Sequence, residues 1–429
     1  MRVAFTTLGC KVNQYETENL SELFAADGFE VVDPSDFADV YVINSCTVTA
    51  SGDKKTRQLL RRLKKQNPAA VAALTGCFPQ AFPDAAEAIS EADVITGSSN
   101  RGDVLPAVKE ALAAGKRVVR ILPHERGEKF EHMSVTGLRG RTRAFVKIED
   151  GCDRYCSYCI IPKARGPVRS KPLNEIREEL SALAENGYRE VVLVGVNLSS
   201  YGKEIGLRLI DAVQAACRTE GIRRVRLGSL EPELLTAEDI RAMAAEEKFC
   251  PQFHLSLQSG CDKTLREMNR HYDSAEYARI VSDIRAAFEN PSITTDVMVG
   301  FAGETEADFE ESLAFVQKIG FAKVHVFSYS RRPGTSADKR SGQVPSSVKE
   351  ERSRRMIEAT DATRKQFLLG QLGKTEEVLV ETTKSPLGYE GFTKNYTPVY
   401  VNCDPALCGN VVKMRLEAVL EGHCIGTLL

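Results

Sequence analysis

The first 120 residues alternate short apolar runs with longer amphipathic stretches. The apolar runs at residues 3–8, 40–44 and 71–75 have the length and composition of buried strands, whereas residues 14–26 and 50–66 repeat apolar positions with a helical period. Strands that alternate with helices indicate a parallel α/β sheet. We therefore predict that the chain begins with a domain of this class.

The same alternation continues over residues 138 to about 330, is followed by a polar and basic stretch to residue 368, and predicts a second domain over residues 138–368. Six strands are expected there, and the first five are each followed by a helical stretch, such as residues 174–185 or 304–318. Six parallel βα units are typical of a partial barrel of the TIM type, whose chemistry lies at the carboxyl ends of the strands. The expected strands are residues 144–148, 190–194, 224–227, 252–257, 294–299 and 323–328.

Beyond residue 370 the pattern changes to short alternating runs with glycine at the turns. Residues 371–429 are predicted to form a small antiparallel β-barrel, similar to OB-like modules that bind nucleic acids. The fold class is therefore α/β, with a parallel α/β domain over residues 1–120, a partial (βα)6 barrel over residues 138–368 and this C-terminal β-barrel.

The composition, with 42% hydrophobic and 27% charged residues, is that of a folded protein. No run of 18 apolar residues occurs and the first residues do not resemble a secretion signal, so we expect a cytoplasmic protein without a membrane span. Thiols stay reduced in the cytoplasm. The twelve cysteines are therefore better explained as metal ligands, redox groups or small buried residues than as disulfide partners.

Three cysteines follow the first three expected strands, and we call Cys10, Cys46 and Cys77 the N-terminal triplet. In an open parallel sheet, ligand sites form beyond the carboxyl ends of the strands, so these cysteines are predicted to converge at one edge. Free cysteines are also common as buried structural residues, and this alternative stays open for the three.

Three further cysteines lie within eight positions in GCDRYCSYCIIP, and we call Cys152, Cys156 and Cys159 the loop triplet. Three thiolates are one fewer than a structural zinc site or an iron–sulfur cube requires. On such a cube, three cysteines would leave one iron open to the amine and carboxylate of an amino acid. The alternative is a zinc site whose fourth ligand comes from elsewhere in the chain.

The C-x3-C-x2-C spacing, with Tyr158 before the third cysteine, resembles the signature of radical S-adenosylmethionine enzymes. Through TLGCKVNQYETE, VGVNLSSYG, LGSLEPE and HLSLQSGCDKTLREMNR the chain is similar over almost its whole length to the methylthiotransferases of that superfamily. The first motif is close to the branch that acts on N6-threonylcarbamoyladenosine in tRNA. Lys163 and Ala302 depart from the family pattern, in which an aromatic residue and a proline are commoner.

This resemblance implies two [4Fe–4S] clusters, one on each cysteine triplet, and S-adenosylmethionine as both methyl donor and radical source. The implied reaction is methylthiolation of C2 of N6-threonylcarbamoyladenosine next to the anticodon. The implied partners are the tRNA anticodon stem-loop and an electron donor such as flavodoxin or ferredoxin, and the C-terminal barrel would be a TRAM domain. No catalytic residue beyond the cluster ligands can be named.

Residues that follow the second to fifth strands of the barrel are expected at its catalytic rim, where they would contact S-adenosylmethionine. A carboxylate can accept two hydrogen bonds, so Glu231 is predicted to bind the ribose hydroxyls or the amino group. Turns between strands and helices need Gly, Ser and Asn in any case, and a plain loop role stays open for each residue. The predicted rim residues are Gly195, Asn197, Ser229, Glu231, Gln258, Ser259, Gly300 and Gly303, and the resemblance adds Tyr158 of the cysteine motif as a further cofactor contact.

The net charge is only −2, so contact with RNA has to come from local basic patches. Residues 53–68 carry seven basic residues against one acidic residue, residues 331–365 are also basic, and residues 139–147 add Arg139, Arg141, Arg143 and Lys147. Such runs are often only solvated surfaces. The RNA contacts predicted from the first two patches are Lys54, Lys55, Arg57, Arg61, Lys64, Arg331 and Arg332.

Two alternative functions remain at this point. The same chemistry could act on N6-isopentenyladenosine in tRNA or on a ribosomal-protein side chain. A different class would be a non-catalytic iron–sulfur or zinc protein that binds RNA. Cys403 and Cys408 have no second cysteine pair near them, so we expect them to be loop or core thiols.

Overall fold

The computed structural model describes all 429 residues and divides them into two compact units. The first unit consists of Met1–Val135, Lys147–Lys171 and Ser330–Asp338, and the second of Thr136–Val146, Pro172–Tyr329 and Lys339–Leu429. Both cysteine triplets belong to the first unit. The three domain boundaries drawn from the sequence remain a prediction. None of the helices has both the length and the hydrophobicity that a membrane-spanning segment needs.

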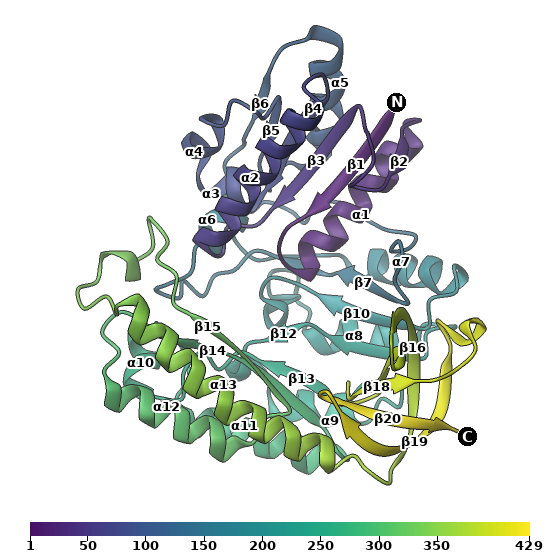
Figure 1. Ribbon diagram of the computed structural model, residues 1–429, viewed down its shortest axis with the longest axis vertical. Helices are drawn as coiled ribbons and strands as arrows, with labels where there is room; N and C mark the ends of the chain where they lie inside the picture. Colours follow the sequence, from purple (N-terminus) through teal and green to yellow (C-terminus); the bar gives the residue numbers. More distant parts are fainter. The chain divides into compact units, whose positions relative to one another are not determined.

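The first unit is built on a parallel sheet of six strands in the order β2-β1-β3-β4-β5-β6 (Figure 1). β3 and β4 are buried along most of their length and β1 at its centre, as expected for parallel strands covered on both faces. The strands are β1 (Arg2–Thr7), β2 (Glu30–Val32), β3 (Val40–Ser45), β4 (Val71–Gly76), β5 (Val94–Thr96) and β6 (Val118–Arg120).

Helices cover both faces of this sheet. α1 (Lys11–Ala26) and α5 (Val104–Ala114) pack on one face, and α2 (Ala50–Gln66), α3 (Cys77–Ala81) and α4 (Pro83–Glu87) pack on the other. The predicted parallel α/β class is confirmed, and the two predicted helices are present. The strands β2, β5 and β6 were not foreseen individually, because three residues are too few to show a period.

The second unit contains the partial barrel. Its parallel strands follow one another in space in chain order and fall into two sheets, β11-β10-β7 and β12-β13-β14-β15. The six predicted strands are all present, and the third continues after Gly228 as β12. The strands are β7 (Arg143–Lys147), β10 (Glu190–Val194), β11 (Arg224–Leu227), β12 (Ser229–Leu230), β13 (Gln252–Leu255), β14 (Ser292–Val299) and β15 (Lys323–Ser328).

The helices of this unit include one that the sequence pattern did not reveal. Residues 331–368 looked merely polar and basic, yet α13 (Ser346–Leu369) occupies most of them and buries Arg352, Met356, Thr360 and Leu368. This stripe has helical spacing, but half of its members are polar, so a search for apolar periodicity misses it. The others are α7 (Leu173–Glu185), α8 (Leu209–Arg218), α9 (Ala237–Ala244), α10 (Asp262–Glu267), α11 (Ser274–Ala287) and α12 (Glu306–Ile319).

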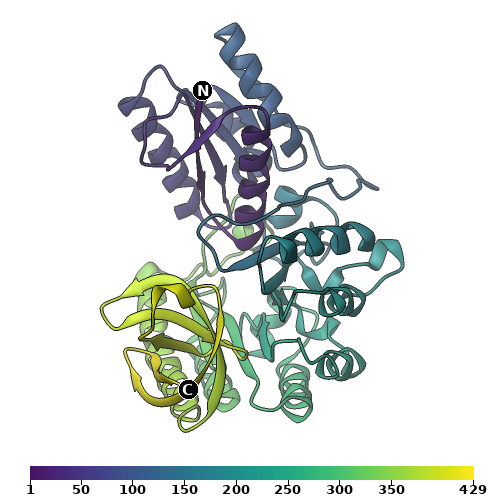
Figure 2. The same cartoon turned by 90° about the vertical axis from the view of Figure 1, so that its right-hand side faces the viewer.

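Residues 375–428 form a closed barrel of five strands in the order β16-β17-β18-β20-β19, drawn in yellow in Figure 2. Four pairs are antiparallel, as predicted, whereas β18 and β20 pair in parallel. A ring with an odd number of strands must contain at least one parallel pair, because alternating directions cannot close on themselves. The strands are β16 (Thr375–Ser385), β17 (Gly388–Thr393), β18 (Pro398–Val401), β19 (Val411–Leu420) and β20 (His423–Leu428).

Within the second unit, buried arginines tie the partial barrel to the β-barrel. Arg226 donates to Glu190 at 2.7 Å and to the carbonyl oxygens of Thr393 and Lys394 at 2.8 and 2.7 Å. Arg224 lies 3.5 Å from the same carboxylate. Burial alone would raise the pKa of Glu190, but the guanidinium groups, Arg226 foremost, lower it overall. Glu190 is therefore a charged anchor of this junction.

We expect Glu190→Gln to lower the free energy of unfolding by about 3–5 kcal/mol at pH 7, because it leaves buried guanidinium groups without their anion. A group with a lowered pKa stabilises the fold fully above its ordinary pKa, here 4.5, and less as the pH falls toward the folded value. The difference between wild type and variant should therefore shrink below pH 4.5 in urea titrations. Asp283→Asn, which breaks an exposed pair with Arg279, should cost less than about 1 kcal/mol.

Candidate active site

The N-terminal triplet lies at the carboxyl ends of three adjacent strands, β1, β3 and β4. Cys10 is the residue before α1, Cys46 follows the last residue of β3, and Cys77 begins α3. Asn13 lies 3.5 Å from the Sγ of Cys10 and donates to the carbonyl of Ser45, which precedes Cys46, and β3 pairs with β4 up to Gly76, which precedes Cys77. The structure thus brings together cysteines that are far apart in the sequence.

Gly9 makes the close approach of two of these loops possible. A Cβ atom on Gly9 would lie 2.8 Å from the Cβ of Cys46 and 3.3 Å from its Sγ, and the backbone φ of Gly9 is 122°. Both the space and the backbone conformation exclude a side chain here. The glycine in TLGC is therefore needed to bring the Cys10 loop against Cys46.

Burial changes the chemistry of these thiols. It raises the pKa of Cys77 to about 12 and also raises the pKa of Cys46. Such thiols become thiolates only when a positive centre such as a metal binds them. Cysteine thiolates are the usual ligands of iron–sulfur cubes, so three thiols at one edge of the sheet fit three irons of such a cube.

The loop triplet lies on a loop that is closed at its base by β8 (Glu149–Asp150) and β9 (Arg169–Ser170), which pair antiparallel. The amide of Cys159 donates to the carbonyl of Cys156 at 2.9 Å, and that of Cys152 donates to Gly166 at 3.0 Å. Burial raises the pKa of Cys152, and the charges of the other two cysteines raise it further. These three thiols therefore also lie together, and Tyr158 between them is half-buried.

The predicted rim residues lie at or beyond the ends of β10, β12, β13 and β14 in the second unit. Gln258 has a left-handed backbone, with φ of 65°, and bridges to β14 through a bond to the carbonyl of Asp296 at 2.8 Å. Left-handed residues other than glycine are strained and concentrate at functional sites. Glu231 already accepts hydrogen bonds from Arg270 on both carboxylate oxygens. Its predicted role would use the remaining lone pairs.

Two sequence profiles match parts of this chain. The Radical SAM superfamily matches residues 146–316, which include the loop triplet and most of the partial barrel. The Uncharacterized protein family UPF0004 matches residues 2–97, which include the N-terminal triplet.

Whole-length relatives decide the family. The threonylcarbamoyladenosine tRNA methylthiotransferase MtaB of Bacillus subtilis is 35% identical over 422 residues, which cover 96% of this chain and 93% of the relative. The chain belongs to the MtaB-like radical S-adenosylmethionine methylthiotransferases. A tRNA-2-methylthio-N(6)-dimethylallyladenosine synthase of Pelotomaculum thermopropionicum is 33% identical over 432 residues. The match covers 98% of this methylthiotransferase and 96% of the synthase. Both branches therefore share the complete layout.

A solved structure supports the fold. The radical S-adenosylmethionine methyltransferase TsrM of Kitasatospora setae matches this methylthiotransferase with a TM-score of 0.57 and 13% identity, over 79% of this chain and 74% of TsrM. At this identity the likeness concerns the fold alone. Together with the three parallel sheets and the closed C-terminal barrel, it confirms the predicted fold class.

The basic residues predicted to contact RNA have unequal exposure. Lys54 and Lys55 are exposed on α2, and Arg57 is half-buried with its guanidinium over the ring of Phe78. Arg61 pairs with Glu91 at 3.3 Å, Lys64 with Asp93 at 2.7 Å, and Arg331 with Asp338 at 3.0 Å.

Arg332 and Lys147 do not belong to a basic surface. Arg332 is buried, with its guanidinium 2.7 Å from a carboxylate oxygen of Asp53 and from the hydroxyl of Thr47. Lys147 is buried against Glu16 at 2.7 Å and Asp150 at 2.6 Å. Their charges are neutralised inside the first unit, which argues against a phosphate contact for either side chain.

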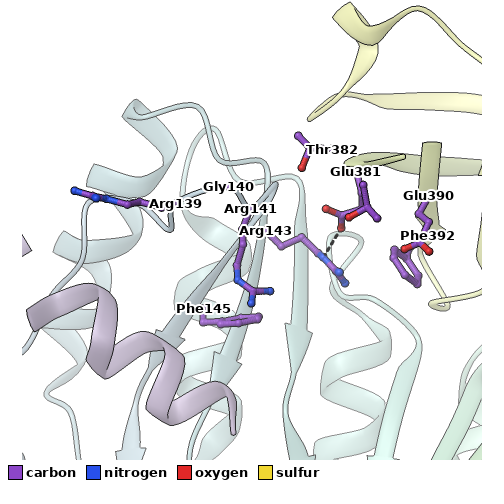
Figure 3. Close-up of a pocket in the computed structure, with 10 residues that line it drawn as sticks. Arg139, Gly140, Arg141, Arg143, Phe145, Glu381, Thr382, Glu390 and Phe392 are labelled. Atoms are coloured by element: carbon purple, nitrogen blue, oxygen red, sulfur yellow. Dashed lines mark ion pairs between the residues drawn. The ribbon is translucent and has the colours of Figure 1, made fainter. Parts of the chain in front are cut away.

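A polar cavity of about 380 Å³ lies within the second unit, between the segment before β7 and the β-barrel (Figure 3). Arg139, Arg141 and Arg143 line one side, and Glu381 and neighbouring side chains of β16 and β17 line the other. Arg143 is held by Glu381 at 2.9 Å, whereas Arg139 and Arg141 are exposed. The cavity adds an exposed basic surface to the one on α2.

Several buried charges near the cysteines were not singled out from the sequence. Arg165, Glu16 and Asp150 form a buried network that also includes Arg101 and Lys147. The available signal was weak: Glu16 falls on the face of α1 that also carries Val12 and Leu20, where a charge is unexpected. Sequence alone could not say which distant cation would meet it.

Gly151 provides a test of the geometry of the cysteine loop. A Cβ there would lie 1.9 Å from the carbonyl oxygen of Pro167, whereas a Cβ on Gly187, which has the same φ of 90°, would meet nothing within 4 Å. Both alanine variants should show the backbone strain, but Gly151→Ala should lose about 1–3 kcal/mol more in the free energy of unfolding. Equal losses in urea titrations would contradict the close approach.

Proposed function

We propose that this enzyme transfers a methylthio group to C2 of N6-threonylcarbamoyladenosine next to the anticodon of tRNA. The observation that carries the proposal is the grouping of six cysteines into two triplets in one compact unit of an MtaB-like chain. A single triplet would suffice for a radical reaction alone. A second triplet with the same three-ligand character supports a reaction that also handles sulfur.

Two [4Fe–4S] clusters and S-adenosylmethionine are the cofactors of this family. We assign one cluster to Cys10, Cys46 and Cys77 and the other to Cys152, Cys156 and Cys159. When bound, these groups supply a carbon-centred radical, a methyl group and sulfur, which an unactivated aromatic C–H bond requires. The protein contributes three thiolates and one open position at each cluster.

The roles of the remaining site residues follow from their positions. Tyr158 lies between two ligands of the loop triplet, and we assign it a contact to S-adenosylmethionine. At the rim, Gly195, Gly300 and Gly303 would let backbone approach the adenine. Polar rim contacts are assigned to Asn197, Ser229, Gln258, Ser259 and Glu231, the last being oriented by Arg270.

The substrate requires a surface that attracts phosphate. We assign this role to Lys54 and Lys55 on α2 and to Arg139 and Arg141 at the cavity beside the β-barrel. Arg57, Arg61, Lys64 and Arg331 stay secondary candidates, since Arg57 is half-buried and the other three pair with carboxylates. The reductant is proposed to be flavodoxin or ferredoxin. Since tRNA is the substrate, we place the reaction in the cytoplasm.

Complementation of a strain that lacks its own methylthiotransferases tests the reaction. We expect the wild-type gene to restore 2-methylthio-N6-threonylcarbamoyladenosine in total tRNA, measured by nucleoside mass spectrometry. Cys77→Ala and Cys156→Ala should each abolish it, because the cluster that loses a cysteine then keeps only two ligands, and the reaction needs both clusters. Cys217→Ala should retain it, since Cys217 is a buried thiol of α8 outside both triplets.

Iron content separates the cluster assignment from the substrate assignment. Anaerobically reconstituted wild type should hold about eight irons per chain. Cys77→Ala and Cys156→Ala should each hold about four, because each loses one cluster. Methylthiolation of N6-isopentenyladenosine instead would overturn the substrate but not the chemistry. Bound zinc without release of 5′-deoxyadenosine would favour a non-catalytic binder.

Salt dependence of tRNA binding tests the two basic surfaces separately. Each phosphate contact contributes about 0.7–0.9 to the magnitude of the slope of log K against log salt, depending on the nucleic acid. Lys54→Ala/Lys55→Ala and Arg139→Ala/Arg141→Ala should each weaken binding and reduce the slope by about 1–2. Arg279→Ala, on an exposed ion pair of α11, should leave affinity and slope unchanged. If a double variant binds tRNA with the affinity and the salt slope of this control, the surface that it changes does not contact the RNA.

A further inference from the structure

Arg165 links the two cysteine triplets through a direct contact. It ends α6 (Ile161–Arg165), the short helix that follows Cys159, and its side chain is 1% exposed. Its Nε donates a hydrogen bond to the Sγ of Cys77 at 3.1 Å. A guanidinium that belongs to the segment of the loop triplet therefore binds a thiol of the N-terminal triplet.

The same guanidinium reaches the other two cysteine loops through Asn13. The Nη2 of Arg165 donates to Oδ1 of Asn13 at 2.5 Å, and the Sγ of Cys10 lies 3.5 Å from that same oxygen. The Nδ2 of Asn13 donates to the carbonyl oxygens of Leu8 at 2.9 Å and Ser45 at 3.1 Å. Ser45 directly precedes Cys46. Arg165 and Asn13 together therefore contact Cys77, Cys10 and the residue before Cys46.

Buried charge holds Arg165 in this orientation. Its Nη1 donates to Glu16 at 2.5 Å and lies 3.3 Å from Asp150. The two carboxylates also bind Lys147 and Arg101, so a buried network of charges fixes the orientation of Arg165. The guanidinium itself places a positive charge next to Cys77, and its charge-assisted hydrogen bond would stabilise a thiolate there.

Apolar packing makes the link rigid. Ile160 and Ala164 form a small buried cluster with Cys77 and Ala81, so α6 packs directly on α3. The three nitrogens of the guanidinium donate to Cys77, Glu16 and Asn13, so the group cannot rotate without breaking several hydrogen bonds.

We propose that Arg165 is a positioning residue for the N-terminal triplet, and that its hydrogen bond to Cys77 sets the electron affinity of the cluster held there. The inference rests on the proposed function, which assigns a [4Fe–4S] cluster to this triplet. Hydrogen bonds to cluster sulfurs and nearby positive charge both stabilise the state that holds an extra electron. Through Arg165, the loop that would carry the radical chemistry also adjusts the site that would carry sulfur.

The test isolates one cluster. In a parent protein with Cys152→Ala, Cys156→Ala and Cys159→Ala, only the N-terminal triplet can be reconstituted with iron and sulfide. Arg165→Lys keeps the charge but loses the planar fork. It should shift the midpoint potential in an EPR-monitored redox titration to more negative values, change the EPR g values and release iron to a chelator several-fold faster.

Arg101→Lys is the matched control. Arg101 is as deeply buried and lies 2.9 Å from the same Glu16, but it contacts no cysteine. It should leave potential, g values and iron release as in the parent. If Arg165→Lys also leaves all three unchanged, the proposal is overturned.

A second variant covers the case in which Arg165→Lys does not fold. Asn13→Ser removes the acceptor of one arm of Arg165 while leaving the buried charges in place. It should shift the same three quantities in the same directions, and an unchanged spectrum would also overturn the proposal. A parent protein that takes up no iron at all would instead contradict the cluster assignment in the proposed function, so the two failures are distinguishable.

Discussion

Neighbouring parallel strands end at the same edge of their sheet, and this constraint decides where the chemistry of the chain can lie. β1, β3 and β4 are adjacent, so the loops that follow them deliver Cys10, Cys46 and Cys77 to one place. Burial then keeps two of these thiols protonated until a positive centre binds them. The site is therefore prepared for metal by its position in the sheet, before any ligand is considered.

Buried carboxylates surrounded by cations recur in both compact units. Glu16 and Asp150 bind several cations beneath the cysteines of the first unit, and Glu190 binds Arg226 and Arg224 at the junction with the β-barrel of the second. Such networks add little net stability, because desolvation offsets the attraction. Their directional hydrogen bonds instead require one arrangement of the segments that meet there. We infer that both networks serve geometry more than stability.

The number of basic residues in a run does not show which of them reach the surface. Arg332 and Lys147 belong to runs that look like RNA-binding surfaces, yet both are buried against carboxylates. Lys54, Lys55 and Arg141 belong to similar runs and are exposed. The count of charges does not distinguish these cases, since Glu16 and Asp53, which pair with Lys147 and Arg332, come from distant segments. A basic run therefore indicates a possible surface, and the fold selects which of its members reach solvent.

The sequence by itself indicated the long buried strands and the helices that follow them, the fold class and the two groups of cysteines, because apolar periodicity and ligand spacing are local properties. It missed α13, whose buried stripe is half polar, and the parallel closing pair of the C-terminal barrel. Only the tertiary structure decided that Arg165 meets Cys77 and Asn13, and that Glu231 is held by Arg270. Contacts of this kind join residues far apart in the chain, and the charge of a side chain does not specify which partner the fold will bring to it.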